Sequence, residues 1–276
     1  MMASIDDVNG IDRFITYSGA EENEISCSLY TNESIHHGSC YSDENILKKT
    51  EPIVQGFPLI QTMINIHAQY FNDVLNQQIS QGYRQIVILR TDSNRRIVRE
   101  PAEGNNYFEI GQDTGLQERH LNSSNTIANV TYVAGDYLKD DFIHLLSKHH
   151  FDCDVPTYFI WEGTTASLKR GSIILILEKI RNQVKHFKLS LGYLSHTVIA
   201  RTTGDPELDQ YMDDLEKMDI HWITGFKDMA TFARALGFKM VETVSIADLY
   251  ARYYSTDSLP SKIFRFHFVC TLECGE

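Results

Sequence analysis

Charged and small residues follow the apolar segments of this chain, at the points where each segment is expected to end as a β-strand. They are Arg90, Thr91, Gly111, Asp136, Glu162 and Gly163. Carboxylates accept hydrogen bonds from hydroxyl and amino groups, and an arginine guanidinium can bind a carboxylate through two parallel hydrogen bonds. Ligands of open α/β sheets bind beyond the carboxyl ends of the strands. We therefore expect a ligand site at one edge of a sheet.

Short β-branched runs alternate along the chain with segments of helical periodicity, which indicates an α/β fold with a mainly parallel sheet. The strands are expected at residues 86–89, 107–110, 130–134, 157–161, 187–194, 238–244 and 264–272. The helices are expected at residues 58–79, 113–121, 140–147, 172–184, 228–236 and 246–253. The simplest organisation is one domain over residues 51–276, with an insertion at about 195–225 that we expect to cover the sheet edge.

Composition excludes several classes of protein. A hydrophobic share of 42% is enough for a sizeable core. The formal net charge of −12 disfavours nucleic-acid binding, which depends on lysine and arginine. No signal peptide or membrane-spanning run is evident, so no membrane partner is expected. The five cysteines are widely spaced without a CxxC pair, and the histidines form no metal-binding pattern. We expect a cytoplasmic protein with reduced thiols and no metal.

The first 50 residues are polar and only weakly patterned. Such a segment can form partly ordered loops or a lid over a site. Oligomeric state is not predicted by any pattern in the sequence.

Four stretches occur in an order that is similar to a known family. They are "GYRQIVIL", "YFEIGQ", "VTYVAGDYLKDDF" and "PTYFIWEGTTASL". In this order they resemble the leucine carboxyl methyltransferase family, and "WEG" is the most specific piece. The later stretch "GFKDMATFARALGFKMVETVSIADLYARYY" resembles the C-terminal part of the same family. The resemblance covers roughly residues 52–272.

The resemblance implies a fold, an activity and a cofactor. The fold is the Rossmann-like sheet of class I methyltransferases, mainly parallel with an antiparallel last strand and with helices on both faces. The activity is O-methylation of a carboxylate or hydroxyl on a small molecule or peptide, with S-adenosylmethionine as methyl donor. Asp136, with Tyr137 beside it, matches the acidic residue near adenine, and Glu162 matches the glutamate at a strand end.

Other positions depart from the family pattern. Arg90 and Asp92 stand where glycines of the first turn are usual, and Asn94 stands where an aspartate is usual. Gly111 replaces the acidic residue that binds ribose, although Glu109 lies two residues earlier.

Two further family positions differ. Ile60 lies at or near the place of the arginine that binds the methionine carboxylate, and Gly192 replaces an aspartate of a later strand.

Two readings of these departures stay open. Arg90 could fill the cofactor pocket, or it could bind the methionine carboxylate from another direction. The chain is accordingly either a working O-methyltransferase or a protein that keeps the fold, has lost methyl transfer and binds a partner or another ligand. An oxidoreductase dependent on NAD is disfavoured, because the three-glycine fingerprint is absent after the first strand.

Each candidate residue also has a structural reading. Asp136 and Glu162 could cap turns, and Tyr137 could belong to the core, as we expect for Trp161. Methyl transfer from a sulfonium depends mainly on alignment, so no catalytic residue is predicted. His196 and His221 are weak candidates for a general base.

Overall fold

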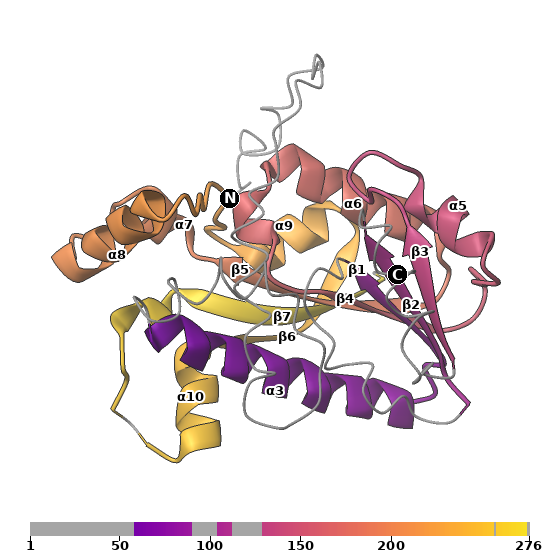
Figure 1. Cartoon of the computed structure of the whole chain (residues 1–276), viewed down its shortest axis with the longest axis horizontal. Coiled ribbons are helices and arrows are strands. Elements are labelled where there is room, and N and C mark those ends of the chain that lie inside the picture. The colour runs from indigo at the N-terminus through magenta and orange to yellow at the C-terminus, as the bar shows by residue number, and fades with distance from the viewer. Residues whose placement is uncertain (1–57, 90–103, 112–128, 257, 275–276) are drawn as a thin grey trace, which may run out of the picture.

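A computed structural model describes residues 58–89, 104–111, 129–256 and 258–274. Within these residues one seven-stranded sheet organises the molecule (Figure 1). Its strands are β1 (Gln85–Leu89), β2 (Asn106–Gly111), β3 (Val130–Ala134), β4 (Thr157–Trp161), β5 (Phe187–Leu194), β6 (Phe238–Ser245) and β7 (His267–Cys274). The α-helices are α3 (Pro58–Ser80), α5 (Phe142–Ser147), α6 (Arg170–Gln183), α7 (His196–Ile199), α8 (Pro206–Lys217), α9 (Met229–Ala235) and α10 (Ile246–Tyr254).

The strand order is β3-β2-β1-β4-β5-β7-β6. Strands β1 to β5 pair in parallel, whereas β7 runs antiparallel to both β5 and β6. All five residues of β1 and of β4 are buried, as is usual for central parallel strands covered on both faces. The Rossmann-like prediction with an antiparallel last strand is confirmed.

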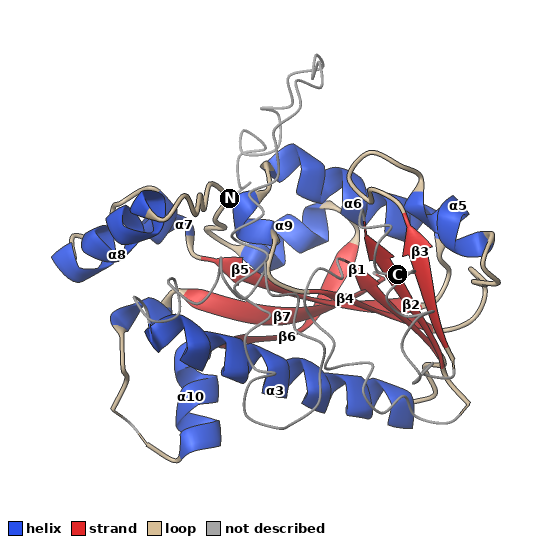
Figure 2. Ribbon diagram, in the orientation of Figure 1, coloured by secondary structure: helices blue, strands red, loops and turns tan. Residues whose placement is uncertain are grey.

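Helices cover both faces of the sheet (Figure 2). On one face α3 and α10 pack on a core that includes Ile86, Ile160 and Val269. On the other face α5, α6 and α9 pack on a core that includes Val87, Trp161 and Leu191. Neighbouring residues of a strand point to opposite faces, so the apolar runs of the sequence supply both cores at once.

Most predicted elements agree with the structure, and the differences lie before the last strand and within the insertion, where α7 was not expected as a helix. The last strand begins at His267, because the preceding apolar residues form the 3₁₀ turn η4 (Lys262–Arg265). Residues 206–217, expected only as part of an insertion, form helix α8. The helix expected at 113–121 and the polar segment 1–50 with its lid role lie outside the described residues.

The insertion returns to the carboxyl end of β5. Ser195 forms a parallel bridge with Phe226, and the Phe226 amide donates to the Leu194 carbonyl at 2.8 Å. The edge strands of the sheet are β3 and β6. Backbone pairing therefore directs the insertion over the carboxyl end of β5 rather than along β3 or β6, and the expected cover of the sheet edge stays a prediction.

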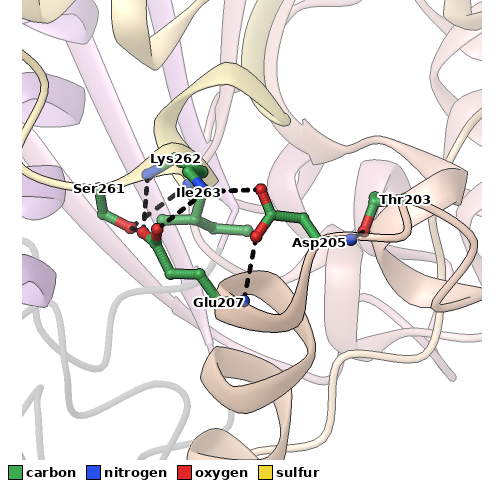
Figure 3. A network of polar contacts seen from close by, with 6 residues as sticks. All are labelled: Thr203, Asp205, Glu207, Ser261, Lys262 and Ile263. Atoms are coloured by element: carbon green, nitrogen blue, oxygen red, sulfur yellow. Dashed lines mark hydrogen bonds and ion pairs between the residues drawn. The ribbon is translucent and has the colours of Figure 1, made fainter.

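A polar network fastens the insertion to the turn before β7 (Figure 3). Lys262 Nζ lies 2.8 Å from Asp205 Oδ2 and 3.3 Å from Glu207 Oε2, at the start of α8. The Lys262 amide also donates to Glu207 Oε1, at 3.3 Å. The hydrogen bond and charge of Lys262 lower the pKa of Asp205. These contacts are exposed, so they orient α8 more than they stabilise the fold.

None of the helices in the described ranges is long and apolar enough to cross a membrane.

Gly225 leaves no room for a side chain where the insertion meets β5. A Cβ there would lie 2.8 Å from the carbonyl oxygen of Ser195 and 2.8 Å from Cα of His196. We expect Gly225→Ala to lower the free energy of unfolding by about 1–3 kcal/mol, because backbone atoms must move apart. Urea unfolding would measure this change. Gly192→Ala is the matched control, since a Cβ there makes only ordinary contacts; equal losses in both variants would contradict the steric cause.

Candidate functional site

The parallel strands end at one edge of the sheet, and the structure places the predicted site residues there as far as it describes them. Glu109 lies on β2, Asp136 and Tyr137 follow β3, and Glu162 follows β4. Arg90, which follows β1, lies outside the described residues. The sheet order puts β1 between β2 and β4, so Glu109 and Glu162 belong to strands on either side of it.

Glu109 is a buried carboxylate, with only 6% of the residue exposed. It pairs in register with Ile88 of β1 and with Tyr132 of β3. Ile88 belongs to the core under α3, so the Glu109 side chain lies on that face of the sheet. Because Ile88 is the last residue but one of β1, Glu109 lies near the carboxyl ends of the strands, where ligands of such sheets bind.

Asp136 has a structural role in the turn after β3. Its Oδ1 accepts from the Leu138 amide at 2.9 Å, and its Oδ2 lies 2.9 Å from Lys139 Nζ. Its own amide donates to Asp140 Oδ2 at 2.8 Å. These contacts fix the Asp136 carboxylate within the turn.

Tyr137 and Trp161 pack against each other in the core on the α6 face. Tyr137 is 4% exposed and Trp161 is fully buried. Their ring centroids lie 6.4 Å apart in an edge-to-face arrangement. The prediction that Trp161 belongs to the core is confirmed. Tyr137 contributes to the same core, whereas its role beside a purine stays a prediction.

Glu162 is half-buried just beyond the last residue of β4. The pKa of the Tyr158 hydroxyl is raised, mainly because the side chain is completely buried. The hydrogen bond with Ser190 opposes this rise, and the negative charge of Glu162 adds to it. Tyr158 belongs to the core under α3, so the Glu162 charge is felt on that face.

A buried polar row continues from Ser190 across the sheet. Ser190 Oγ lies 2.7 Å from Thr271 Oγ1, and Thr271 Oγ1 lies 3.4 Å from the Tyr70 hydroxyl of α3. Buried polar groups of this kind are stable when they pair with one another. The row therefore joins β5, β7 and α3 beneath the carboxylate edge.

The three carboxylates do not form one compact cluster. Asp136 and Glu162 follow β3 and β4, which the sheet order separates by β2 and β1. Three strand spacings correspond to about 14 Å. A single ligand that contacts both residues must be elongated and must cross the ends of β2 and β1.

Two buried histidines at the same edge escaped the sequence analysis. His67 of α3 is 1% exposed and His267 of β7 is 5% exposed. Their ring centroids lie 4.7 Å apart. His67 interrupts the apolar stripe of α3, four residues after Met63 and four before Phe71, and this was its one signal in the sequence.

Gly192 of β5 lies against this pair. A Cβ at Gly192 would lie 3.7 Å from Cε1 of His67 and 3.8 Å from Nε2 of His267. Trp222 of the insertion lies on the other side, 5.9 Å from the His267 ring between centroids. We call these four residues, His67, Gly192, Trp222 and His267, the histidine cluster.

The earlier histidine candidates lie outside this cluster. His221 is exposed, and its Nε2 lies 2.9 Å from Asp219 Oδ1, so its ring has a solvated partner. His196 is half-buried at the start of α7. Neither histidine contacts the carboxylates of the site in the contacts that the structure shows. Their role as a general base stays a prediction.

A groove of about 840 Å³ lies elsewhere, along β6 and the end of β7. Its residues include Phe238 and Cys274, which pair at the amino edge of the parallel strands. It therefore faces away from the carboxylate edge. In the described parts of the chain, no group of three or more histidine, cysteine, aspartate or glutamate residues is arranged to hold a metal ion.

A model of the leucine carboxyl methyltransferase family matches residues 27–181, more than half of the chain. The chain belongs to this family. The match includes the carboxylate edge as far as Glu162 and ends within α6. No curated protein matched the sequence.

Solved structures support the family fold. A candidate methyltransferase from Thermobifida fusca has 14% identity and a TM-score of 0.57, with 91% of this chain and 94% of that chain covered. A protein of the DUF574 family from Streptomyces avermitilis has 13% identity and a TM-score of 0.59, with 90% and 97% covered. At these identities the similarity shows a shared fold.

Within the leucine carboxyl methyltransferase family, the departures of this chain fall into two groups. Arg90, Asp92 and Asn94 lie outside the described residues, and the Ile60 side chain is likewise not described. Gly192 is described, and a Cβ at this position would make ordinary van der Waals contacts with His67 and His267. The family model ends at residue 181, so His67 lies within the matched segment, whereas Gly192, Trp222 and His267 lie beyond it.

His267 should make folding sensitive to mildly acidic pH. Complete burial lowers its pKa from 6.5 to about 4, so between these values the unfolded chain binds a proton that the folded chain does not. Stability is full above pH 6.5 and falls as the pH drops towards 4, by roughly 2–3 kcal/mol for this group. Urea unfolding should show that the free energy of unfolding falls less between pH 7 and pH 5 in His267→Gln than in the wild-type protein. The control is His221→Ala, which removes an exposed histidine. If His267→Gln lost as much free energy of unfolding between pH 7 and pH 5 as the wild-type protein, His267 would not be the cause of the pH dependence.

Proposed function

We propose that this protein is an O-methyltransferase that uses S-adenosylmethionine. The observation that carries the proposal is membership of the leucine carboxyl methyltransferase family, on a sheet whose carboxyl edge keeps Glu109, Asp136 and Glu162. When bound, S-adenosylmethionine supplies a methyl group on a cationic sulfur that leaves as a neutral thioether. The acceptor is a carboxylate or hydroxyl of a small molecule or peptide.

The carboxylate edge suits an elongated ligand with hydroxyl and amino donors. Asp136 would accept from the adenine end, and Glu109 would accept from ribose hydroxyls near the end of β2. Glu162, at the end of β4, would face the amino-acid end, where its half-buried carboxylate complements a cationic group. The protein would accelerate the reaction mainly by aligning the acceptor with the methyl group and by excluding water.

Calorimetric titration with S-adenosylmethionine and with S-adenosylhomocysteine tests the proposal directly. We expect saturable heat, and at 100-fold excess over Kd a rise in Tm of about 5–10 °C. Glu162→Gln should weaken binding by about 10-fold or more, because an amide replaces a charged hydrogen-bond acceptor. Glu216→Gln, a change on the exposed face of α8, is the matched control. No heat and no thermal shift for either ligand would refute the proposal.

A second candidate function has its own observation in the sequence. The turn after β1 carries Arg90 and Asp92 where family members usually have glycines. A protein of this fold that has lost methyl transfer, and binds a partner or a different ligand, would explain this change.

Arg90→Gly separates the two functions. In a methyltransferase whose Arg90 binds the methionine carboxylate, the substitution should weaken S-adenosylmethionine by about 10-fold, the loss of a charged hydrogen bond. In a protein whose Arg90 fills the pocket, the substitution should create or strengthen binding. Calorimetric titration of the wild-type protein and of Arg90→Gly with S-adenosylmethionine distinguishes the two outcomes. Unchanged binding would contradict both roles of the side chain.

A further inference from the structure

The outer side of β6 is an open edge of the sheet. β6 stands last in the strand order, and among the described residues its only neighbouring strand is β7. Lys239 and residues 241–243 are exposed there, and 47% of Val241 is accessible to solvent. The groove of about 840 Å³ runs along the same part of β6 and is bordered by Arg234 of α9. The backbone groups of an open edge can pair with the strand of another molecule.

A β-bulge interrupts β6 at Val241. The register with β7 shifts by one residue between Met240 and Glu242, which leaves Val241 as the extra residue. Residues three apart in a regular strand point to opposite faces, whereas one extra residue between them brings Lys239 and Glu242 to one face. The Glu242 carboxylate accepts from the Tyr70 hydroxyl of α3 at 3.5 Å, so this face is the one that α3 covers.

The pairing of the strands confirms that Lys239 lies on the α3 face. Lys239 is in register with Glu273 of β7, and its Nζ lies 2.8 Å from Glu273 Oε1. Glu273 is in turn in register with Lys188 of β5, whose Nζ lies 2.9 Å from Gln81 Oε1, just after α3. Residues in register on neighbouring strands share a face of the sheet. A cation and an anion therefore lie on one face of the open edge, on either side of the bulge.

The order of residues across the bulge is self-complementary. It reads Lys239, Met240, Val241, Glu242, so two apolar residues stand between a cation and an anion. A second copy of β6 in antiparallel orientation can place each Lys239 opposite the partner's Glu242. The same register places each Met240 opposite the partner's Val241. Every residue of the bulge thus meets a side chain of matching character, and the charges that meet share the α3 face.

Other registers lose this match. A shift by one residue in either direction places Lys239 opposite the partner's Val241 or the partner's Thr243, and both ion pairs are lost. A two-fold axis at Lys239 or at Glu242 places like charges opposite each other, which is destabilising. Charges and bulges commonly protect an open edge from indiscriminate pairing. On β6 the same two features allow one register and disfavour its neighbours.

We propose that β6 is a dimerisation surface, which pairs with β6 of a second copy of this chain about a two-fold axis at the bulge. The sheets of the two molecules then join into one continuous sheet. A two-fold contact uses the same patch twice and closes the assembly at two copies. By sheet order, the nearest of the three site carboxylates is Glu162, which follows β4, and β5 and β7 separate β4 from β6. The dimer therefore leaves the carboxylate edge of each copy open.

Sedimentation of the full chain under reducing conditions, over about 1–200 μM, tests the proposal. We expect a reversible equilibrium between monomer and dimer with a Kd in the micromolar range. Lys239→Glu and Glu242→Lys should each weaken the dimer by about 10-fold or more, because each replaces two attractive pairs with two repulsive pairs. A wild-type chain that stays monomeric over this range, or a dimer that neither substitution weakens, would overturn the proposal.

Mixing the two variants tests the register itself. A Lys239→Glu chain opposite a Glu242→Lys chain again has opposite charges at both positions, so the mixture should form a heterodimer with a Kd near that of the wild-type dimer. The double variant, with both substitutions in one chain, should regain the homodimer for the same reason. A damaged fold could not produce either rescue. If both single variants lost the dimer and neither rescue occurred, the proposed register would be wrong.

Two controls separate dimerisation from folding and from cofactor binding. Lys148→Glu makes the same change of charge at the C-cap of α5 and should leave the Kd of the dimer unchanged. Thermal unfolding verifies that each variant is folded. Calorimetry with S-adenosylhomocysteine should give the same heat for Lys239→Glu as for the wild-type protein, because the two surfaces lie on different strands. Failure of the methyltransferase proposal would leave the sedimentation result intact, and the reverse also holds.

Discussion

The antiparallel pairing of β7 with β5 is the constraint on which the rest of the site depends. In a purely parallel sheet, the beginning of a strand lies at the edge opposite to the ligand. Because β7 runs the other way, its first residue pairs with the last residue of β5, as the register of His267 with Leu194 shows. This pairing brings His267 and the preceding turn η4 to the same edge as Glu162. The insertion can then be fastened to η4 by Lys262 while Trp222 lies against His267.

Burial on both faces explains why chemistry is confined to this edge. Strands β1 and β4 are buried throughout, so their inward positions must be apolar or mutually paired. Ser190 and Thr271 satisfy this requirement by bonding each other at 2.7 Å. One turn of α3 earlier than Tyr70, the His67 ring lies against Gly192 and beside His267. Two residues after Ser190 on β5, the same face of the sheet carries the histidine cluster, in which His267 Nδ1 has no hydrogen-bond partner among the described residues.

Local sequence was enough to predict elements with clear boundaries. The strands at 130–134, 157–161 and 187–194 have the predicted bounds, because each is an apolar run limited by polar or turn residues. Helix α8 was missed because its acidic residues hide apolar positions spaced three and four apart, at Leu208, Met212 and Leu215. The start of β7 was misplaced because the 3₁₀ turn before it also contains buried apolar residues, Ile263 and Phe264. Periodicity cannot separate a short turn from a strand when both are buried.

The candidate site was predictable only where it depends on strand ends. Glu109, Asp136 and Glu162 lie in or just after apolar runs, so a parallel sheet alone brings them to one edge. His67 and His267 are 200 residues apart in the sequence. They meet only because α3 packs on the sheet and β7 pairs antiparallel with β5. The two groups of residues lie on different elements: the carboxylates lie in or just after β2, β3 and β4, and the histidines lie on α3 and β7. Burial alone lowers the pKa of His267, because a carboxylate beside the ring would favour its charged form instead.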